Sequence, residues 1–133
     1  MIPFEDLPMI VYTYQLAHWR RLQKGPVPLV DTTVKTGDPR LAPSWAMVRG
    51  IKDGTWSEEE YTRAYNQLLD YWHVQDPLFW EELLCRPVVA FGCYCPAGTF
   101  CHRHLLVDFL RRLTDVDYRG ELTEPLPADQ TPV

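Results

Sequence analysis

The chain lacks several features that would place it in a large functional class at once. No apolar run approaches the roughly 20 residues that a helix needs to span a bilayer. The N-terminal segment carries Glu5 and Asp6 where a secretory signal needs basic residues. We therefore expect a cytoplasmic protein with no membrane partner. A surplus of basic residues is also missing, because the formal net charge of the 133 residues is −5. This charge argues against a general duplex-DNA binder.

Cysteines are few, and they are not spread along the chain as in a secreted disulfide framework. Of the four, Cys93, Cys95 and Cys101 fall within nine residues, and Cys85 lies apart. In a reducing compartment such crowding indicates metal binding or thiol chemistry. We expect Cys85 to belong to the core, because unpaired cysteine is among the most buried residue types.

Apolar residues make up 46% of the chain, and their spacing is typical of an α/β domain. Runs of β-branched and aromatic residues predict strands at 9–14, 27–30 and 87–94 and a short edge strand at 118–122. Periodicity, caps and prolines predict helices at 16–24, at 44–49, after Ser57, after Asp76 and at 101–113.

The order of these elements predicts the sheet. A strand–helix–strand unit is typical of parallel strands. The near-continuous apolar run at 87–94 predicts a central strand that is covered on both faces. We expect residues 1–122 to form a single three-layer α/β domain, with a small, mainly parallel sheet flanked by helices. Residues 123–133 contain three prolines, and we expect a mobile tail there.

Polar residues gather just after two of the predicted strands. One group runs from Asp31 to Lys35, and the other runs from Cys93 to Arg103. In open α/β sheets, ligands bind outside the carboxyl ends of parallel strands. We therefore expect both groups to meet at one edge of the sheet and to form a site there.

Metal binding is one interpretation of the second group. Zinc takes four tetrahedral ligands from cysteine and histidine, and Cys93, Cys95, Cys101 and either His102 or His104 could supply them. The C-x-C spacing of Cys93 and Cys95 is tighter than usual, but alternate residues of an extended segment share a face.

A reactive thiol or an anion pocket is the other interpretation. Cys101 or Cys95, at a helix N-terminus and near a cation, suits a thiolate, with His102 or His104 as a base. The free N–H groups of the same helix favour a phosphate or carboxylate. In that pocket Arg103 and Lys35 would pair with the anion, and the hydroxyls of Thr32 and Thr33 would donate to it.

The run from Cys93 to Arg103 resembles the C-terminal signature of the DUF488 proteins, in which a strand ends in cysteine and a Cys-His-Arg triplet opens the next helix. Tyr12-Thr13 and Leu29-Val30-Asp31 resemble the family's first two strands. The smaller DUF4326 family has a similar cysteine-rich strand end. Where DUF488 members have an arginine soon after the aspartate, this chain has Thr32 to Lys35, and Cys95 is an extra cysteine. The resemblance implies a three-layer α/β domain, found in bacteria and phages, and implies no established activity.

These observations predict a domain that binds, and in an enzymatic form processes, a nucleotide or another phosphate-bearing small ligand. Cys101 or His102 would perform the chemistry, Asp31 would orient a partner, and Arg103 would hold the anion. The ligand-binding set is Arg103, Lys35, Thr32, Thr33 and Cys95. Two alternatives are a zinc-stabilised, non-enzymatic interaction protein of phage or bacterial origin, and a protein that binds another protein through its aromatic-rich helices at 61–84.

Overall fold

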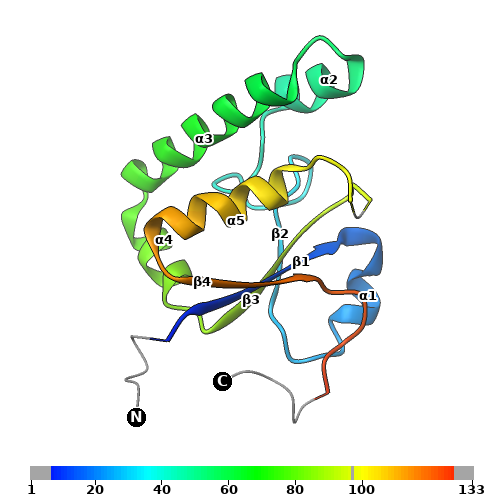
Figure 1. Ribbon diagram of the computed structural model, residues 1–133, viewed down its shortest axis with the longest axis vertical. Helices are drawn as coiled ribbons and strands as arrows, with labels where there is room; N and C mark the ends of the chain where they lie inside the picture. Colours follow the sequence, from blue (N-terminus) through cyan, green and yellow to red (C-terminus); the bar gives the residue numbers. More distant parts are fainter. Residues whose placement is uncertain (1–6, 97, 128–133) are drawn as a thin grey trace.

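Four parallel strands form the centre of the molecule. The computed structural model describes residues 7–96 and 98–127 (Figure 1). The strands are β1 (Met9–Gln15), β2 (Leu29–Asp31), β3 (Val88–Cys93) and β4 (Val116–Glu121), in the order β2-β3-β1-β4. All three neighbouring pairs are parallel. The predicted α/β class and parallel sheet are therefore confirmed, and β3 is a central strand with all six residues buried, as its apolar run predicted.

Helices cover the two faces of the sheet unequally. The helical elements are η2 (Leu16–His18), α1 (Trp19–Leu22), α2 (Trp45–Asp53), α3 (Glu58–Gln75), α4 (Pro77–Leu84) and α5 (His102–Leu113). Figure 1 shows α3, α4 and α5 on one side of the sheet and α1 on the other. We name these sides the α5 face and the α1 face.

Successive strand residues point to opposite faces, and this alternation builds one core on each side. On the α5 face, Val11 and Phe91 pack with α2–α5. On the α1 face, Tyr14 and Ala90 pack with Leu22 of α1. The same alternation continues to the carboxyl ends of the strands, where it decides which side chains reach which side of the site.

Local signals place three of the helices where the sequence predicts them. The Ser44 side chain accepts from Met47 N–H at the start of α2. Ser57 and Glu60 form both bonds of the capping box that begins α3. Asp76 caps α4, with Pro77 at its first turn. In contrast, α5 begins after Cys101, whose side chain makes no capping hydrogen bond.

The structure corrects the predicted boundaries of several helices and strands and the predicted burial of one cysteine. The helix predicted at 16–24 is two short pieces, η2 and α1, and neither has a side-chain cap. The second strand begins at Leu29, and the edge strand begins at Val116. The prediction that Cys85 belongs to the core is wrong, because Cys85 is exposed just beyond the end of α4.

The predicted tail falls partly outside the described residues, which exclude 128–133 and the first six residues of the predicted domain. The described part of the tail contacts the body of the protein. Thr123 O accepts hydrogen bonds from the Arg21 guanidinium at 2.8 and 3.0 Å. Within the described ranges, no helix has both the length and the apolar character required to cross a bilayer.

Candidate functional site

The two predicted polar groups meet at the carboxyl edge of the sheet. Because the strands are parallel, β2 and β3 deliver Asp31 and Cys93 to the same edge. A cavity of about 460 Å³ lies there, between the loop after β2, helix α2 and the loop that leads from β3 into α5. We name it the cysteine cavity, and its lining includes Thr33, Lys35, Trp45, Tyr61, Cys93, Cys95, Cys101 and His102.

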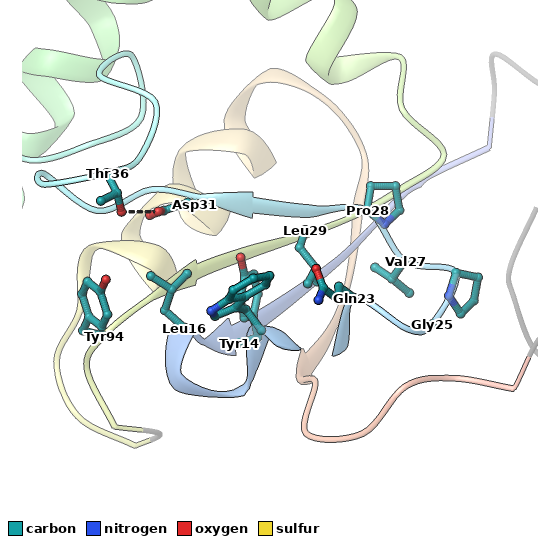
Figure 2. Close-up of a pocket in the computed structure, with 12 residues that line it drawn as sticks. Tyr14, Leu16, Gln23, Gly25, Val27, Pro28, Leu29, Asp31, Thr36 and Tyr94 are labelled. Atoms are coloured by element: carbon teal, nitrogen blue, oxygen red, sulfur yellow. Dashed lines mark hydrogen bonds between the residues drawn. The ribbon is translucent and has the colours of Figure 1, made fainter. Parts of the chain in front are cut away.

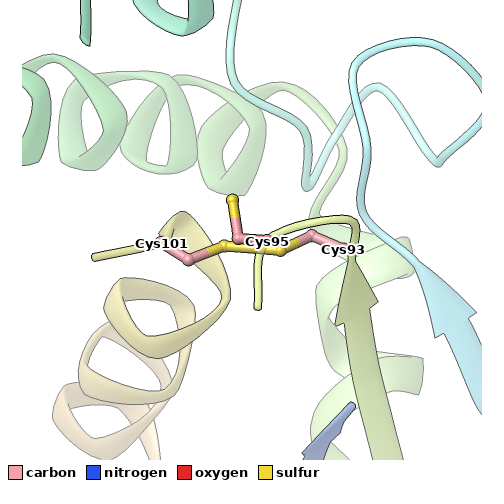
Figure 3. Close-up of side chains that lie close together, drawn as sticks. All are labelled: Cys93, Cys95 and Cys101. Atoms are coloured by element: carbon pink, nitrogen blue, oxygen red, sulfur yellow. A yellow bond between two sulfur atoms is a disulfide. The ribbon is translucent and has the colours of Figure 1, made fainter. Parts of the chain in front are cut away.

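Three cysteines form a compact cluster in this cavity. The sulfur atoms of Cys93, Cys95 and Cys101 all lie within 4.8 Å of one another. Figure 3 shows the sulfur atoms of Cys93 and Cys101 joined as a disulfide, with the Cys95 sulfur beside them. The Cα atoms of Cys93 and Cys101 are 7.9 Å apart, whereas a relaxed disulfide spans about 4.4–6.8 Å. We therefore treat Cys93 and Cys101 as thiols.

Arg103 lies beneath this cluster and has no exposed surface. Its Nη1 donates to Cys93 Sγ at 2.7 Å and to Cys95 O at 3.0 Å. Its Nη2 donates to Glu121 Oε1 at 2.8 Å and to Pro96 O at 3.4 Å, and its Nε donates to Glu121 Oε2 at 3.3 Å. These bonds use all five N–H groups of the guanidinium. An anion could bind Arg103 only if one of these bonds opened, so the role predicted for Arg103 stays a prediction.

Glu121 is a site residue that the sequence reasoning missed. It ends β4 and forms an ion pair with Arg103, and Thr13 Oγ1 also donates to its carboxylate. Burial raises the pKa of Glu121, but the hydrogen bonds and the charge of Arg103 outweigh burial and bring it below its ordinary value. His104 Nε2 lies 3.7 Å from Glu121, so this histidine faces the carboxylate instead of joining the cysteine cluster. The sequence analysis placed Glu121 inside an edge strand at 118–122, so the rule that singled out polar residues just after a strand did not reach it.

His102 is buried, and its hydrogen bonds define its tautomer. Thr32 Oγ1 donates to Gly92 O at 2.9 Å, so this hydroxyl and Thr32 O, each 2.9 Å from His102 Nε2, accept from the ring. The proton therefore belongs on Nε2, and the Nδ1 lone pair lies 3.7 Å from Cys101 Sγ. Burial lowers the pKa of His102 to about 4, so the ring is neutral at pH 7.

The loop after β2 divides its side chains between two cavities. Thr33 and Lys35 line the cysteine cavity, and Thr32 is buried against His102. The Asp31 carboxylate lines a different cavity of about 650 Å³ on the α1 face (Figure 2). The structure thus brings Lys35 and Thr33 to the cysteines but does not bring Asp31 among them, and the catalytic role predicted for Asp31 stays a prediction.

The comparison with protein families agrees with this architecture. A family model described as "Active DUF488-N3 subclade" matches residues 15–114. The chain belongs to the DUF488 family. The DUF488 match spans the whole Cys93–Arg103 segment and the loop after β2, and it ends before Glu121. No curated protein and no solved structure matches the chain.

Proposed function

We propose that this DUF488 protein binds a nucleotide or another phosphate-bearing small ligand in the cysteine cavity. One observation carries the proposal: the polar loops that follow β2 and β3 line a single cavity at the carboxyl edge of a parallel sheet. Ligands of open α/β sheets bind at this position. The cavity volume of about 460 Å³ lies within the range of small-molecule sites.

The lining supports an anionic ligand with a flat part. Lys35 and Lys52 bring two ammonium groups to the cavity of a protein whose net charge is −5. The first N–H groups of α5 have no side-chain cap and favour a phosphate. Trp45 lines the same cavity, and half of its surface is exposed, so its ring is available to stack on a base.

The thiols supply the chemistry in an enzymatic form, and the description of the matched family as active supports such a form. Arg103 Nη1 donates to Cys93 Sγ at 2.7 Å and orients this sulfur, and Cys101 and Cys95 line the same cavity as candidate nucleophiles. His102 accepts a hydrogen bond from the Cys101 thiol, and its low pKa means that it orients this thiol without holding a proton at pH 7.

A zinc-stabilised module without catalysis is the second candidate, and the three clustered sulfur atoms favour it. Tetrahedral zinc with a sulfur and a nitrogen ligand holds these atoms about 3.6 Å apart, by the usual bond lengths. The observed distance from Cys101 Sγ to His102 Nδ1 is 3.7 Å. Cys93, Cys95, Cys101 and His102 would be the ligands, although Arg103 beside Cys93 would then repel the ion.

Titration calorimetry with ADP tests the first proposal. Replacing both cavity lysines, in Lys35→Met/Lys52→Met, should lower the ADP affinity about 10-fold or more, because charge-assisted hydrogen bonds are lost. Lys24→Met changes an exposed lysine outside this cavity and should leave the affinity unchanged. Equal ADP affinity in the double variant and the wild type would exclude the cysteine cavity as the phosphate site.

Metal analysis of the purified protein distinguishes the second candidate. A zinc site would give one zinc per chain, unfolding on chelation, and loss of the metal in Cys93→Ser and Cys101→Ser. The matched control is Cys85→Ser, which changes an exposed cysteine away from the cluster. If the metal-free protein folds normally and binds ADP, the zinc-stabilised module is excluded and phosphate-ligand binding remains as the proposed function.

A further inference from the structure

The second cavity differs from the cysteine cavity in its chemistry. It opens on the α1 face, at the carboxyl ends of β1 and β2, and its volume is about 650 Å³. In Figure 2, Asp31 and Tyr94 lie at one end of this cavity, Gln23 and Val27 lie at the other, and Tyr14 lies between them. Among the described residues that line it, none is basic. This lining disfavours a phosphate and suits a ligand that donates hydrogen bonds. We name it the α1-face cavity.

Tyr14 is a buried residue that lines the α1-face cavity. The side chain is 2% exposed, and within the described residues its hydroxyl has no hydrogen-bond partner. Its ring lies directly on the backbone of Gly92, where a Cβ atom would come within 2.2 Å of Tyr14 Cζ. Burial, and secondarily the charge of Asp31, raise the pKa of Tyr14, so the phenol keeps its proton. A fixed phenol O–H at the cavity, without a protein partner among the described residues, is free to donate to a ligand acceptor.

Asp31 presents a fixed acceptor to the same space. Its Oδ1 accepts from Thr33 N at 2.8 Å and from Thr33 Oγ1 at 2.7 Å, and its Oδ2 accepts from Thr36 Oγ1 at 2.5 Å. Oδ2 therefore retains a free acceptor site. Within the part of the chain that the structure describes, no lysine, arginine or histidine forms a salt bridge with Asp31. An oriented carboxylate without a cation suits neighbouring hydroxyl groups, as carboxylates do for ribose in dinucleotide sites.

Trp19 adds a flat apolar surface. It is the first residue of α1, lines the cavity, and keeps 43% of its surface exposed. The Arg20 guanidinium lies 5.8 Å from the centre of the Trp19 ring, outside the lining of the cavity. Tryptophan rings of this kind stack on planar ligands and on nucleic-acid bases.

We propose that the α1-face cavity is a second ligand site, which binds the ribose and base of an uncharged ribonucleoside. One ribose hydroxyl donates to the free acceptor site of Asp31 Oδ2, Tyr14 donates to an oxygen or nitrogen of the ligand, and the base stacks on Trp19. This site does not depend on the ligand of the cysteine cavity, because Tyr94 is the only described residue that the two linings share.

Titration calorimetry of the full chain with adenosine, guanosine, cytidine and uridine tests this site. At least one should bind, and its 2′,3′-dideoxy analogue should bind about 10-fold more weakly or worse, because the charged acceptor Asp31 loses the donor that the ribose supplies. Asp31→Asn should weaken the ribonucleoside by about 10-fold, and Tyr14→Phe by about 5-fold. Tyr12→Phe is the matched control, because Tyr12 lies on the same strand and face but outside the lining.

Three results would overturn the second site: no binding of any ribonucleoside at millimolar concentration, equal binding of the dideoxy analogue, or unchanged affinity in both variants. Tyr14→Phe keeps the ring on Gly92, so it tests the hydroxyl even if Asp31→Asn unfolds the loop. The Lys35→Met/Lys52→Met variant should keep its ribonucleoside affinity. If it loses that affinity as well as ADP binding, there is a single site in the cysteine cavity, and the second site fails alone.

Discussion

The two cavities lie at the same edge of one sheet and carry opposite chemistry. The cysteine cavity has thiols, two lysines and a neutral histidine, whereas the α1-face cavity has a carboxylate, phenols and no basic residue in its described lining. Adjacent residues supply both, because strand side chains alternate between faces. Gly92 pairs with Asp31 and supports the α1-face cavity, and Cys93, the next residue, belongs to the other. One edge of a parallel sheet thus carries two cavities of different chemistry with few residues.

The largest expected effect comes from the arginine under the cysteine cavity. Removing one partner of a fully buried ion pair costs about 3–5 kcal/mol. Because Glu121 keeps 19% exposure, we expect Arg103→Met to lower the free energy of unfolding by about 2–4 kcal/mol. Urea denaturation measures this loss.

Arg119→Met is the control for this measurement. It breaks the exposed ion pair with Asp117 on the same strand, β4, and should cost about 0–1 kcal/mol. If Arg103→Met instead left stability unchanged and abolished ADP binding, Arg103 would be an anion ligand, as its position in the sequence suggested. Arg103, which pairs with Glu121 in the structure, would then be a third cation of the cysteine cavity beside Lys35 and Lys52.

Local signals and periodicity predicted most of the fold and part of the site. The capping box at Ser57, the proline at Pro77 and the apolar run of β3 are determined by neighbours in sequence, so they could be predicted directly. The meeting of the loops at Asp31 and Cys93 followed from the parallel sheet alone.

The pairing of Arg103 with Glu121 could not be predicted in the same way. It requires β4 to lie beside β1, and this strand order is set by long-range packing. The face on which Asp31 lies depends on the register with Gly92, which a sequence without its partner strand does not reveal. Tyr14 escaped notice because an apolar strand residue becomes a site residue only when a cavity opens beside it.

Acid should lower the stability of the protein through His102, which lies at the cysteine cavity, with a smaller effect than Arg103→Met. Histidine in the unfolded chain has a pKa of about 6.5, and burial lowers the pKa of His102 to about 4 in the folded protein. Between these values the unfolded chain binds more protons, so stability decreases as the pH falls from 6.5 to 4. The full shift corresponds to about 3 kcal/mol as an upper value.

Urea denaturation between pH 7 and pH 4 measures this dependence. His102→Gln keeps a donor towards Thr32 but does not titrate, so its stability should fall less steeply than that of the wild type. His104→Gln is the control, because burial also lowers the pKa of His104, although that side chain is partly exposed and faces Glu121. Parallel curves for wild type and His102→Gln would mean that His102 is solvated and that the cysteine cavity is more open than its burial indicates.

The smallest substitution tests the α1-face cavity through Gly92, the residue on which the Tyr14 ring lies. Gly92→Ala adds one methyl group, which would lie 2.2 Å from Tyr14 Cζ, so the ring must move off the strand. Overpacking of this kind costs about 1–3 kcal/mol in the free energy of unfolding. The displaced phenol should also weaken ribonucleoside binding while ADP binding stays unchanged.

The double variant Gly92→Ala/Tyr14→Ala is the control. The clash is absent in it, so it should be more stable than the sum of the two single changes predicts. If the losses in the free energy of unfolding are additive, Gly92 is needed for the strand itself and does not fix the position of Tyr14. Ribonucleoside binding in the α1-face cavity would then depend on Asp31 and Trp19, without a fixed position for Tyr14.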